Sequence, residues 1–224
     1  MKKIVLLFLL LILLLQLYLP GMAAENIKNL LFEEVDTGEN VQVEVRSFPA
    51  WEILLQKRVD HLNITADSIT FQKLKLENVN AKYENTHYNR EKFNGENTDL
   101  TFHIKESTLN NYLSEKYPEL EGMDINLAPD RVNMAGYINV FDNKFEIRVG
   151  GDLSFDKTNK LNFTPEEFRV EEISLPGYIT KNILKDLKFV IDFDQLQIPL
   201  KAEEVKVGSD RIHISGGLSA GKVG

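Results

Sequence analysis

The chain of 224 residues contains no cysteine and only one tryptophan, Trp51. Without cysteine it forms no disulfides, so an exported protein of this sequence depends on hydrophobic burial alone for its stability. The same absence excludes a lipid attached to cysteine after the N-terminal apolar run. About 200 residues beyond that run are enough to bury one good core, and we expect a single domain over 25–217.

Positive charge is also scarce, with 26 Lys and Arg against 34 Asp and Glu and a net charge of −8. Residues 1–24 hold two lysines and no acid, so removing them would take the net charge from −8 to −10. A nucleic-acid-binding protein needs the opposite sign, and that class is excluded. The negative surplus also repels an anionic membrane surface, so any contact with anionic lipid must be local.

Motifs for metal binding and nucleophilic catalysis are missing. The sequence has no HExxH and no G-x-S-x-G motif, and its histidines show no metal-binding spacing; they are His61, His87, His103 and His213. A histidine such as His103, inside an alternating strand, is more often exposed or hydrogen-bonded than catalytic. We therefore predict no metal site and no cofactor.

Two further patterns resemble catalytic or phosphate-binding motifs and are better explained otherwise. Asp192 and Asp194 place two carboxylates on one side of an extended segment, but glycosidases need carboxylates of opposed environment in a cleft. Residues 216–222, GGLSAGK, match G-x-x-x-x-G-K, but Val223 stands where a P-loop needs Ser or Thr. We expect 218–224 to be a flexible tail and the protein not to be an enzyme.

The N-terminus has the layout of a secretory signal peptide. Lys2 and Lys3 precede an apolar run from Ile4 to Leu19, and small residues follow at Ala23 and Ala24. We predict that 1–24 is a signal peptide and that the protein is exported. The alternative is an uncleaved anchor that tethers the protein. The run would span roughly 24 Å as a helix, less than the ~30 Å hydrocarbon core of a bilayer, which favours cleavage.

The rest of the chain reads mainly as antiparallel strands. Apolar residues alternate over 132–140 and 145–155 around a turn at Asp142-Asn143, and a last hairpin turns at 208–210. Leu196, Ile198 and Leu200 predict a further strand, and the polar region 85–99 a long hairpin loop. Between Phe71 and Leu74, and again between Leu76 and Val79, the alternation changes parity. Each change predicts a β-bulge, so the strands should be strongly curved.

Three amphipathic helices are predicted among these strands: Pro49 to about Lys57, Glu106 to Tyr117, and Pro176 to about Ile191. The predicted fold is α+β: a strongly curved, mainly antiparallel sheet that wraps two to three amphipathic helices. The helices either cap the sheet in a fully packed core or leave an elongated apolar cavity. In such a cavity, burial of a dozen methylenes contributes on the order of 10 kcal/mol before binding costs.

If the cavity exists, the apolar helix faces would line it and bind lipid. Those residues are Phe48, Trp51, Leu54, Leu55, Leu109, Tyr112, Leu113, Ile179, Ile183 and Leu187. Lys181, Lys185 and Lys188 lie on the opposite face of the third helix, where they could meet a phosphate headgroup. The alternative for these lysines is an ordinary solvated face.

The order of several segments resembles the LmeA-like phospholipid-binding family of bacterial envelope proteins. ENIKNLL leads to VEVRSFPAWEILLQKRVDHLNITAD, IKESTLNNYL, RVNMAGYINV and finally LQIPLKAEEVKVGSDRIHISGG. The residues that carry the resemblance are Phe48-Pro49, Ala66-Asp67, Leu109-Asn110 and Ile198-Pro199. One departure is Gln56-Lys57-Arg58, where many relatives have a glycine at the end of the first helix.

This resemblance implies an exported, non-catalytic protein with a tubular lipid-binding fold, similar to the bactericidal permeability-increasing proteins. It also implies phospholipid or another acyl lipid as the binding partner, and peripheral contact with a membrane. Fold likeness alone does not establish function. The rival hypothesis is an envelope structural or protein-interaction module whose core is fully packed.

Overall fold

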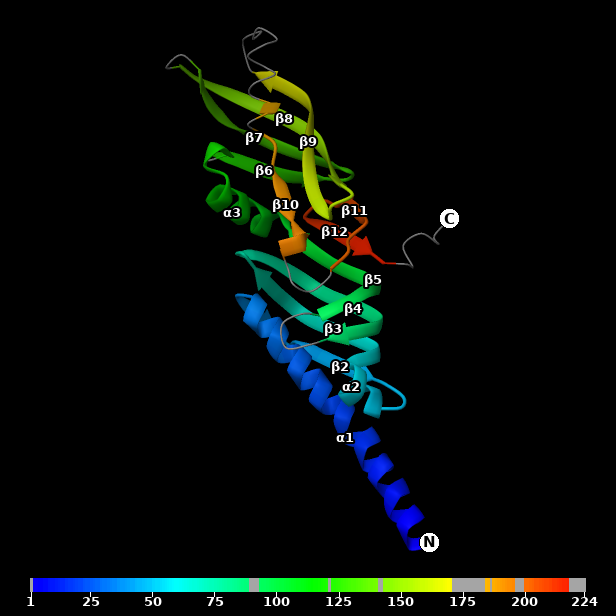
Figure 1. Cartoon of the computed structure of the whole chain (residues 1–224). Helices are drawn as coiled ribbons and strands as arrows, with labels where there is room; N and C mark the ends of the chain where they lie inside the picture. The colour runs from blue at the N-terminus through cyan, green and yellow to red at the C-terminus, as the bar shows by residue number, and fades with distance from the viewer. Residues whose placement is uncertain are drawn as a thin grey trace.

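The computed structural model describes residues 2–88, 93–120, 122–140, 143–170, 184–185, 187–195 and 200–217. The molecule is elongated, with the N-terminal helix projecting from one end, a seven-stranded sheet (sheet A) in the middle and a five-stranded sheet (sheet B) at the other end (Figure 1). The structure confirms the predicted α+β class, with a mainly antiparallel, strongly curled sheet and a few helices.

Helix α1 runs without interruption from Lys2 to Glu34, through Pro20. It therefore makes one element of the apolar N-terminal run and the segment around Ile27. Residues before position 19 are mostly exposed. From Leu19 to Leu31 every fourth residue is buried, because a spacing of four keeps side chains on one helix face. This buried stripe, which packs toward strand β2 (Gln42–Arg46), consists of Leu19, Ala23, Ile27 and Leu31.

Sheet A has seven strands in the order β1-β3-β4-β5-β12-β11, with β2 also paired to β3. Its long central strands are β3 (Arg58–Phe71), β4 (Leu74–Tyr88) and β5 (Phe93–Lys105). The shorter strands are β1 (Thr37–Glu39), β2 (Gln42–Arg46), β11 (Glu204–Val207) and β12 (Arg211–Gly216). Helix α2 (Trp51–Gln56) connects β2 to β3, and every pairing is antiparallel.

The curl of sheet A comes from irregularities between β4 and β5. The register shifts between Glu77 and Asn80, between Lys82 and Tyr83, and between Glu84 and His87. The first shift confirms the bulge predicted from the change of parity between Leu76 and Val79. The other predicted bulge, between Phe71 and Leu74, is wrong: Gln72 and Lys73 form a two-residue turn with φ of 46° and 69°, the conformation that hairpins favour.

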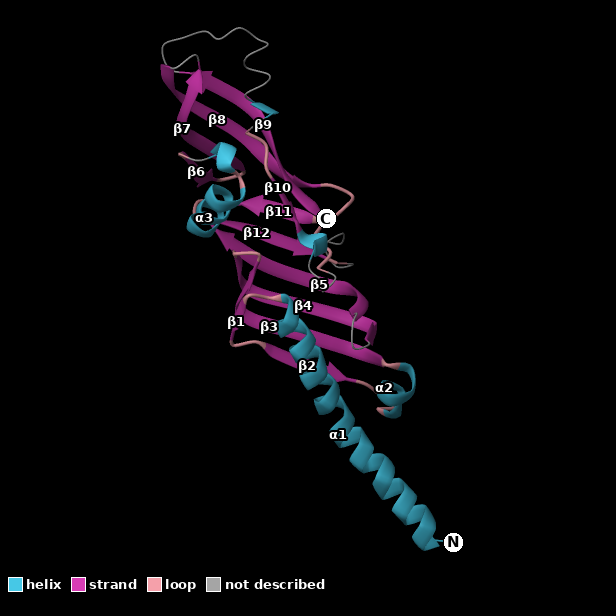
Figure 2. Ribbon diagram, turned by 60° about the vertical axis from the view of Figure 1, so that its left-hand side comes forward, coloured by secondary structure: helices cyan, strands magenta, loops and turns pink. Residues whose placement is uncertain are grey.

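Sheet B has five strands in the order β10-β9-β8-β7-β6, and Figure 2 shows it beyond β11 and β12. The strands are β6 (Met123–Ala128), β7 (Arg131–Val140), β8 (Asn143–Phe155), β9 (Lys160–Val170) and β10 (Val190–Asp192). The β7–β8 and β11–β12 hairpins confirm the two predicted from sequence. Helix α3 (Glu106–Lys116) ends one residue before the predicted end, and the 3-10 turns η1 and η2 cover Pro118–Leu120 and Phe193–Gln195.

Four local predictions need correction or lie outside the described residues. Much of the polar region 85–99 belongs to strands β4 and β5 rather than to a loop. The predicted third helix does not extend to its end, because Val190 and Ile191 pair with β9 as strand β10. Residues 171–183, which hold the first half of that helix, and 196–199, which hold most of the Leu196–Leu200 strand, lie outside the described residues, as does the tail 218–224.

Candidate functional site

The site residues predicted on the first helix form an exposed group. Phe48, Trp51, Leu54 and Leu55 are all solvent-accessible, with Phe48 and Leu55 about four-fifths exposed. Helix α2 turns Ile53 inward instead, and Ala50, just before it, is also buried. This helix lies at the end of sheet A where α1 leaves the body (Figures 1 and 2).

The residues predicted on the second helix have the opposite environment. Leu109, Tyr112 and Leu113 are buried where α3 packs on β6 and on the ends of β4 and β5. Burial raises the pKa of Tyr112 to about 12. The structure therefore does not bring the α2 and α3 residues together: they lie at different places along the molecule (Figure 1).

Of the residues predicted on the third helix, Leu187 is buried, whereas Lys185 and Lys188 are exposed. Ile179, Ile183 and Lys181 lie outside the described residues. The two described lysines are thus accessible to a ligand or to solvent.

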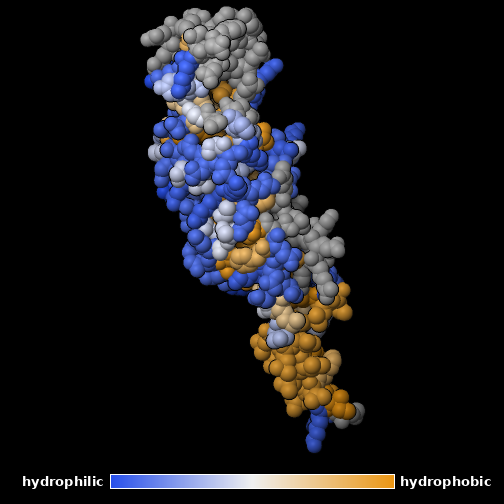
Figure 3. All heavy atoms as spheres, turned by 90° about the vertical axis from the view of Figure 1, so that its left-hand side faces the viewer, coloured by the Kyte–Doolittle hydropathy of each residue, from blue (hydrophilic) through white to orange (hydrophobic). Residues whose placement is uncertain are grey.

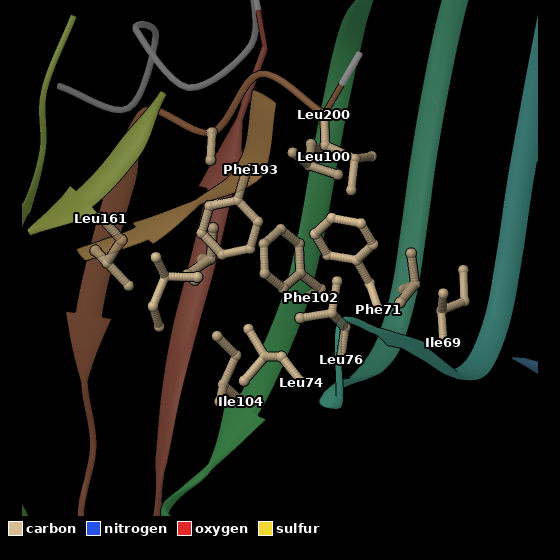
Figure 4. Close-up of a cluster of buried hydrophobic side chains, with 14 of the residues drawn as sticks. Ile69, Phe71, Leu74, Leu76, Leu100, Phe102, Ile104, Leu161, Phe193 and Leu200 are labelled. Carbon is tan, nitrogen blue, oxygen red and sulfur yellow. The ribbon is translucent and has the colours of Figure 1, made fainter. Parts of the chain in front are cut away.

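The inner face of sheet A is apolar along its length. Alternate residues of β3, β4, β5 and β12 point to this face and are buried; they include Leu62, Ile64, Ala81, Tyr83, Leu100, Phe102, Ile104 and Ile212. Burial raises the pKa of the Tyr83 hydroxyl well above its usual value, which reflects how dry this interior is. Figure 4 shows part of the cluster, with Phe102 facing Phe193.

A cavity of about 540 Å³ opens where sheet A meets the β8–β9 turn, and we call it the mouth. This volume is within the range of small-molecule sites. The mouth is lined by Gly95, Phe155, Asp156, Lys157, Thr158, Asn159, Asp194, Leu200, Lys201, Ala202 and Glu203. Its lining combines three apolar side chains, Phe155, Leu200 and Ala202, with two cations and three acids.

Asn159 holds the two sides of the mouth together. Its side-chain nitrogen donates to the Leu200 carbonyl oxygen at 2.7 Å and to Asp194 Oδ1 at 3.1 Å, and its oxygen accepts from Ala202 N at 2.9 Å. Asn159 also has a φ of 55°, a conformation that asparagine tolerates better than most residues. The turn before it is fixed by Asp156, which accepts hydrogen bonds from Thr158 and Lys160; these bonds lower the pKa of Asp156 to about 2.

An aromatic row leads from the mouth into the interior. The ring centroids of Phe155 and Phe193 are 5.9 Å apart, and those of Phe193 and Phe102 are 5.5 Å apart. Phe102 belongs to the inner face of sheet A, so apolar side chains follow one another from Phe155 at the mouth to that face. Figure 4 shows the inner pair, Phe193 and Phe102. The sequence singled out Asp194 and Leu200 for other reasons but missed the mouth, because its two sides are about 40 residues apart in the chain.

Two further polar features lie on sheet A. A cavity of about 360 Å³ lies over β2, β3 and β4, with Glu44, Arg46, His61, Lys82 and Glu84 among its lining residues. The rings of His103 on β5 and His213 on β12 pack edge to face, with their centroids 4.3 Å apart. Burial and the neighbouring His213 and Arg211 lower the pKa of His103. Within the described ranges, no three His, Asp or Glu side chains are grouped to hold a metal ion.

Comparison with known proteins gives one clear match. The family model described as LmeA-like phospholipid-binding matches residues 17–217, which is most of the chain. Searches of curated proteins and of solved structures found no match. The matched region begins inside α1, just after Gln16, and ends just after β12, so it includes both sheets, the mouth and α2. The chain therefore belongs to the LmeA-like phospholipid-binding family.

Proposed function

We propose that this protein is an exported, non-catalytic lipid-binding protein of the bacterial cell envelope, and that it holds acyl chains along the inner face of sheet A. Membership of a phospholipid-binding family supports a role in lipid binding and a phospholipid as partner. The proposed position of the acyl chains rests on the mouth and on the aromatic row behind it.

The observation that carries this proposal is the continuity of apolar surface from Phe155 through Phe193 to Phe102. An acyl chain that enters the mouth meets Phe155 first, then Phe193 and Phe102, and each of these side chains is apolar. Transfer of about a dozen methylenes contributes on the order of 10 kcal/mol before the costs of binding. Such a ligand needs no catalytic group to hold it, only displacement of side chains along the row.

The rim of the mouth favours a headgroup that carries both charges. Lys157 and Lys201 provide cations for a phosphate, whereas Glu203 and Asp194 provide carboxylates for an amine. With Asp156 included, the acids outnumber the cations by three to two. A zwitterionic phospholipid therefore fits this rim better than a purely anionic one. The exposed Lys185 and Lys188, with Lys181, remain the alternative position for a phosphate that the sequence suggested.

The rival proposal is an envelope structural or protein-interaction module with a fully packed core. The buried faces of α3 and of the inner sheet favour it, because these residues are already covered by protein. The two proposals differ in what they expect of added lipid: only the first expects uptake of an acyl probe and stabilisation by lipid.

Solvent extraction of the protein purified from its native envelope, followed by mass spectrometry, tests the proposal. We expect co-purified phospholipid and uptake of a fluorescent phosphatidylcholine. The double variant Lys157→Glu/Lys201→Glu should weaken uptake, whereas Lys206→Glu, on the exposed edge strand β11, should not. A lipid-free protein that takes up no acyl probe would favour the packed module instead.

A further inference from the structure

Helix α1 has two halves with opposite surroundings. We call the half from Lys2 to Tyr18 the stalk; apart from Lys2 and Lys3 it is almost wholly apolar, and most of its side chains are exposed (Figure 3). The other half carries the buried stripe from Leu19 to Leu31. Within the described part of the chain, α1 is the one helix long and apolar enough to cross a membrane.

The stalk is joined to the folded body by its single amide side chain. Gln16 Nε2 donates to the Ser47 carbonyl oxygen at 2.7 Å, and Ala50 N donates to Gln16 Oε1 at 2.8 Å. Both partners are backbone groups of the loop that precedes α2. Cleavage after Ala23 or Ala24 would remove these two bonds together with Leu19, which is buried against the body. A segment destined for removal needs no such contacts.

Next to Gln16, the loop before α2 and α2 itself expose four large apolar side chains, which we call the foot: Phe48, Trp51, Leu54 and Leu55. An exposed group of large apolar side chains commonly marks a protein or membrane interface. The acid of α2 does not interrupt the foot, because Glu52 forms an ion pair with Arg58 at 2.8 Å. Arg58 in turn contacts Asp60 at 3.2 Å. The foot therefore carries no unpaired acid on α2 that would oppose contact with lipid.

We propose that α1 is retained as a membrane anchor and that the foot inserts into the extracytoplasmic face of the same bilayer. The lengths agree with this arrangement. From Ile4 to Met22, whose side chain is exposed, about 19 residues of helix span roughly 28 Å, close to the ~30 Å hydrocarbon core. Gln16 lies about 9 Å below Met22 on the same helix, so the adjacent foot reaches the 5–10 Å depth of interfacial helices.

The chemistry of the segment fits the same position. Lys2 and Lys3 stay on the cytoplasmic side, as the positive-inside rule requires. Tyr18 on the stalk and Trp51 on the foot are the aromatic types that gather at membrane interfaces. Gln16 is acceptable at this depth because both ends of its amide are hydrogen-bonded. This proposal does not depend on an acyl chain inside sheet A, so either proposal can fail without the other.

Intact mass measures retention of the anchor directly. The full chain, with a C-terminal tag, is expressed in a bacterial host and purified from the membrane fraction in detergent. We expect a mass that includes residues 2–24. A mass that begins at Ala24 or Glu25, or a protein found only in the soluble extract, overturns the proposal.

The sole tryptophan reports the position of the foot. The full chain is reconstituted in phosphatidylcholine vesicles whose acyl chains are brominated either near the glycerol end or near the methyl end. We expect Trp51 fluorescence to be quenched, and more strongly by the bromines near the glycerol end. In the control Trp51→Phe/Tyr137→Trp, the only tryptophan is moved to exposed β7, in sheet B far from the stalk, where no quenching is expected.

A second variant separates insertion from simple proximity. Leu55 is 78% exposed, so Leu55→Glu leaves the fold intact and places a charge on the foot. We expect this variant to lose Trp51 quenching while it remains in the membrane fraction; Tyr137→Glu should lose none. If Leu55→Glu is quenched as strongly as the wild type, or if the wild type is not quenched, the foot does not enter the bilayer and the docking proposal is refuted.

Discussion

Asn110 on α3 provides the sharpest test of how sheet B is held. Its Nδ2 donates to the Ile125 carbonyl oxygen at 2.8 Å, and its Oδ1 accepts from Ile125 N at 2.7 Å. Ile125 belongs to β6, the last strand of sheet B, and these backbone groups face away from β7. Glu106 does the same for the next backbone N–H that faces outward: its Oε2 accepts a hydrogen bond from Leu127 N at 2.7 Å. Together the two side chains act in place of a further strand.

We predict that Asn110→Ala destabilises the protein by about 2–4 kcal/mol. The change removes both bonds to Ile125, and a buried polar group left without a partner costs about 1–3 kcal/mol. For a domain of this size, each kcal/mol lowers Tm by roughly 2–4 °C, so the expected fall is roughly 5–15 °C. Asn110→Asp should also destabilise, because it keeps the acceptor for Ile125 N but sets a carboxylate oxygen against the Ile125 carbonyl.

The assay is denaturant unfolding of the purified full chain in detergent, monitored by circular dichroism. Asn111→Ala is the matched control: Asn111 is the next residue, has the same side chain, and is exposed. Because Asn110→Ala also uncovers an edge strand, it should aggregate more readily at high protein concentration. If Asn110→Ala and Asn111→Ala change the free energy of unfolding equally, the side chain of Asn110 does not stabilise the edge of β6 and this reasoning is wrong.

Two further predictions concern backbone space and pH. Gly136→Ala should destabilise strongly, since an added Cβ would lie 2.4 Å from the Gly122 carbonyl oxygen. Gly21 lies inside α1, and a Cβ added there would meet nothing within 4 Å, so Gly21→Ala should stabilise the helix by about 0.5–1 kcal/mol. Thermal unfolding of the two variants tests both expectations. The pKa of Asp60 is lowered by a hydrogen bond from Phe48 N, and by Arg58 and Ser47. Its stabilisation is therefore present above the ordinary carboxyl pKa and is lost as pH falls through the lowered value. Asp60→Asn should destabilise at pH 7, and its difference from the wild type should shrink as pH falls through the lowered pKa; a difference independent of pH would contradict this.

Local patterns in the sequence predicted the elements that depend on neighbouring residues. The β7–β8 hairpin followed from strict alternation around a short turn, and α3 from the spacing of Leu109, Tyr112 and Leu113. The change of parity after Leu76 located a real bulge. The same signal after Phe71 was misread, since a two-residue turn also changes parity and only the positive φ values of Gln72 and Lys73 distinguish the two cases.

Features that join distant parts of the chain could not be predicted in this way. The pairing of β5 with β12 unites segments more than 100 residues apart, and no local pattern indicates it. The mouth depends on Asn159, whose sequence context reads as an ordinary turn. The predicted lipid-binding residues were chosen by apolar helix faces alone. That criterion cannot separate an exposed face such as that of α2 from a buried one such as that of α3.

The unbroken course of α1 has a mechanical consequence. At 33 residues it is a rod about 50 Å long, and no loop separates its stalk from its buried stripe. If the stalk crosses the bilayer, no flexible linker lets the body move independently of the anchor. The height and the orientation of the body over the membrane are then fixed by the tilt of one helix. The distance of the mouth from the lipid surface would then be set by that tilt. Exchange of lipid with that surface would depend on lateral diffusion of the anchored protein in the membrane and on helix tilt. It would not depend on three-dimensional diffusion of an unanchored protein through the periplasm or another extracytoplasmic space.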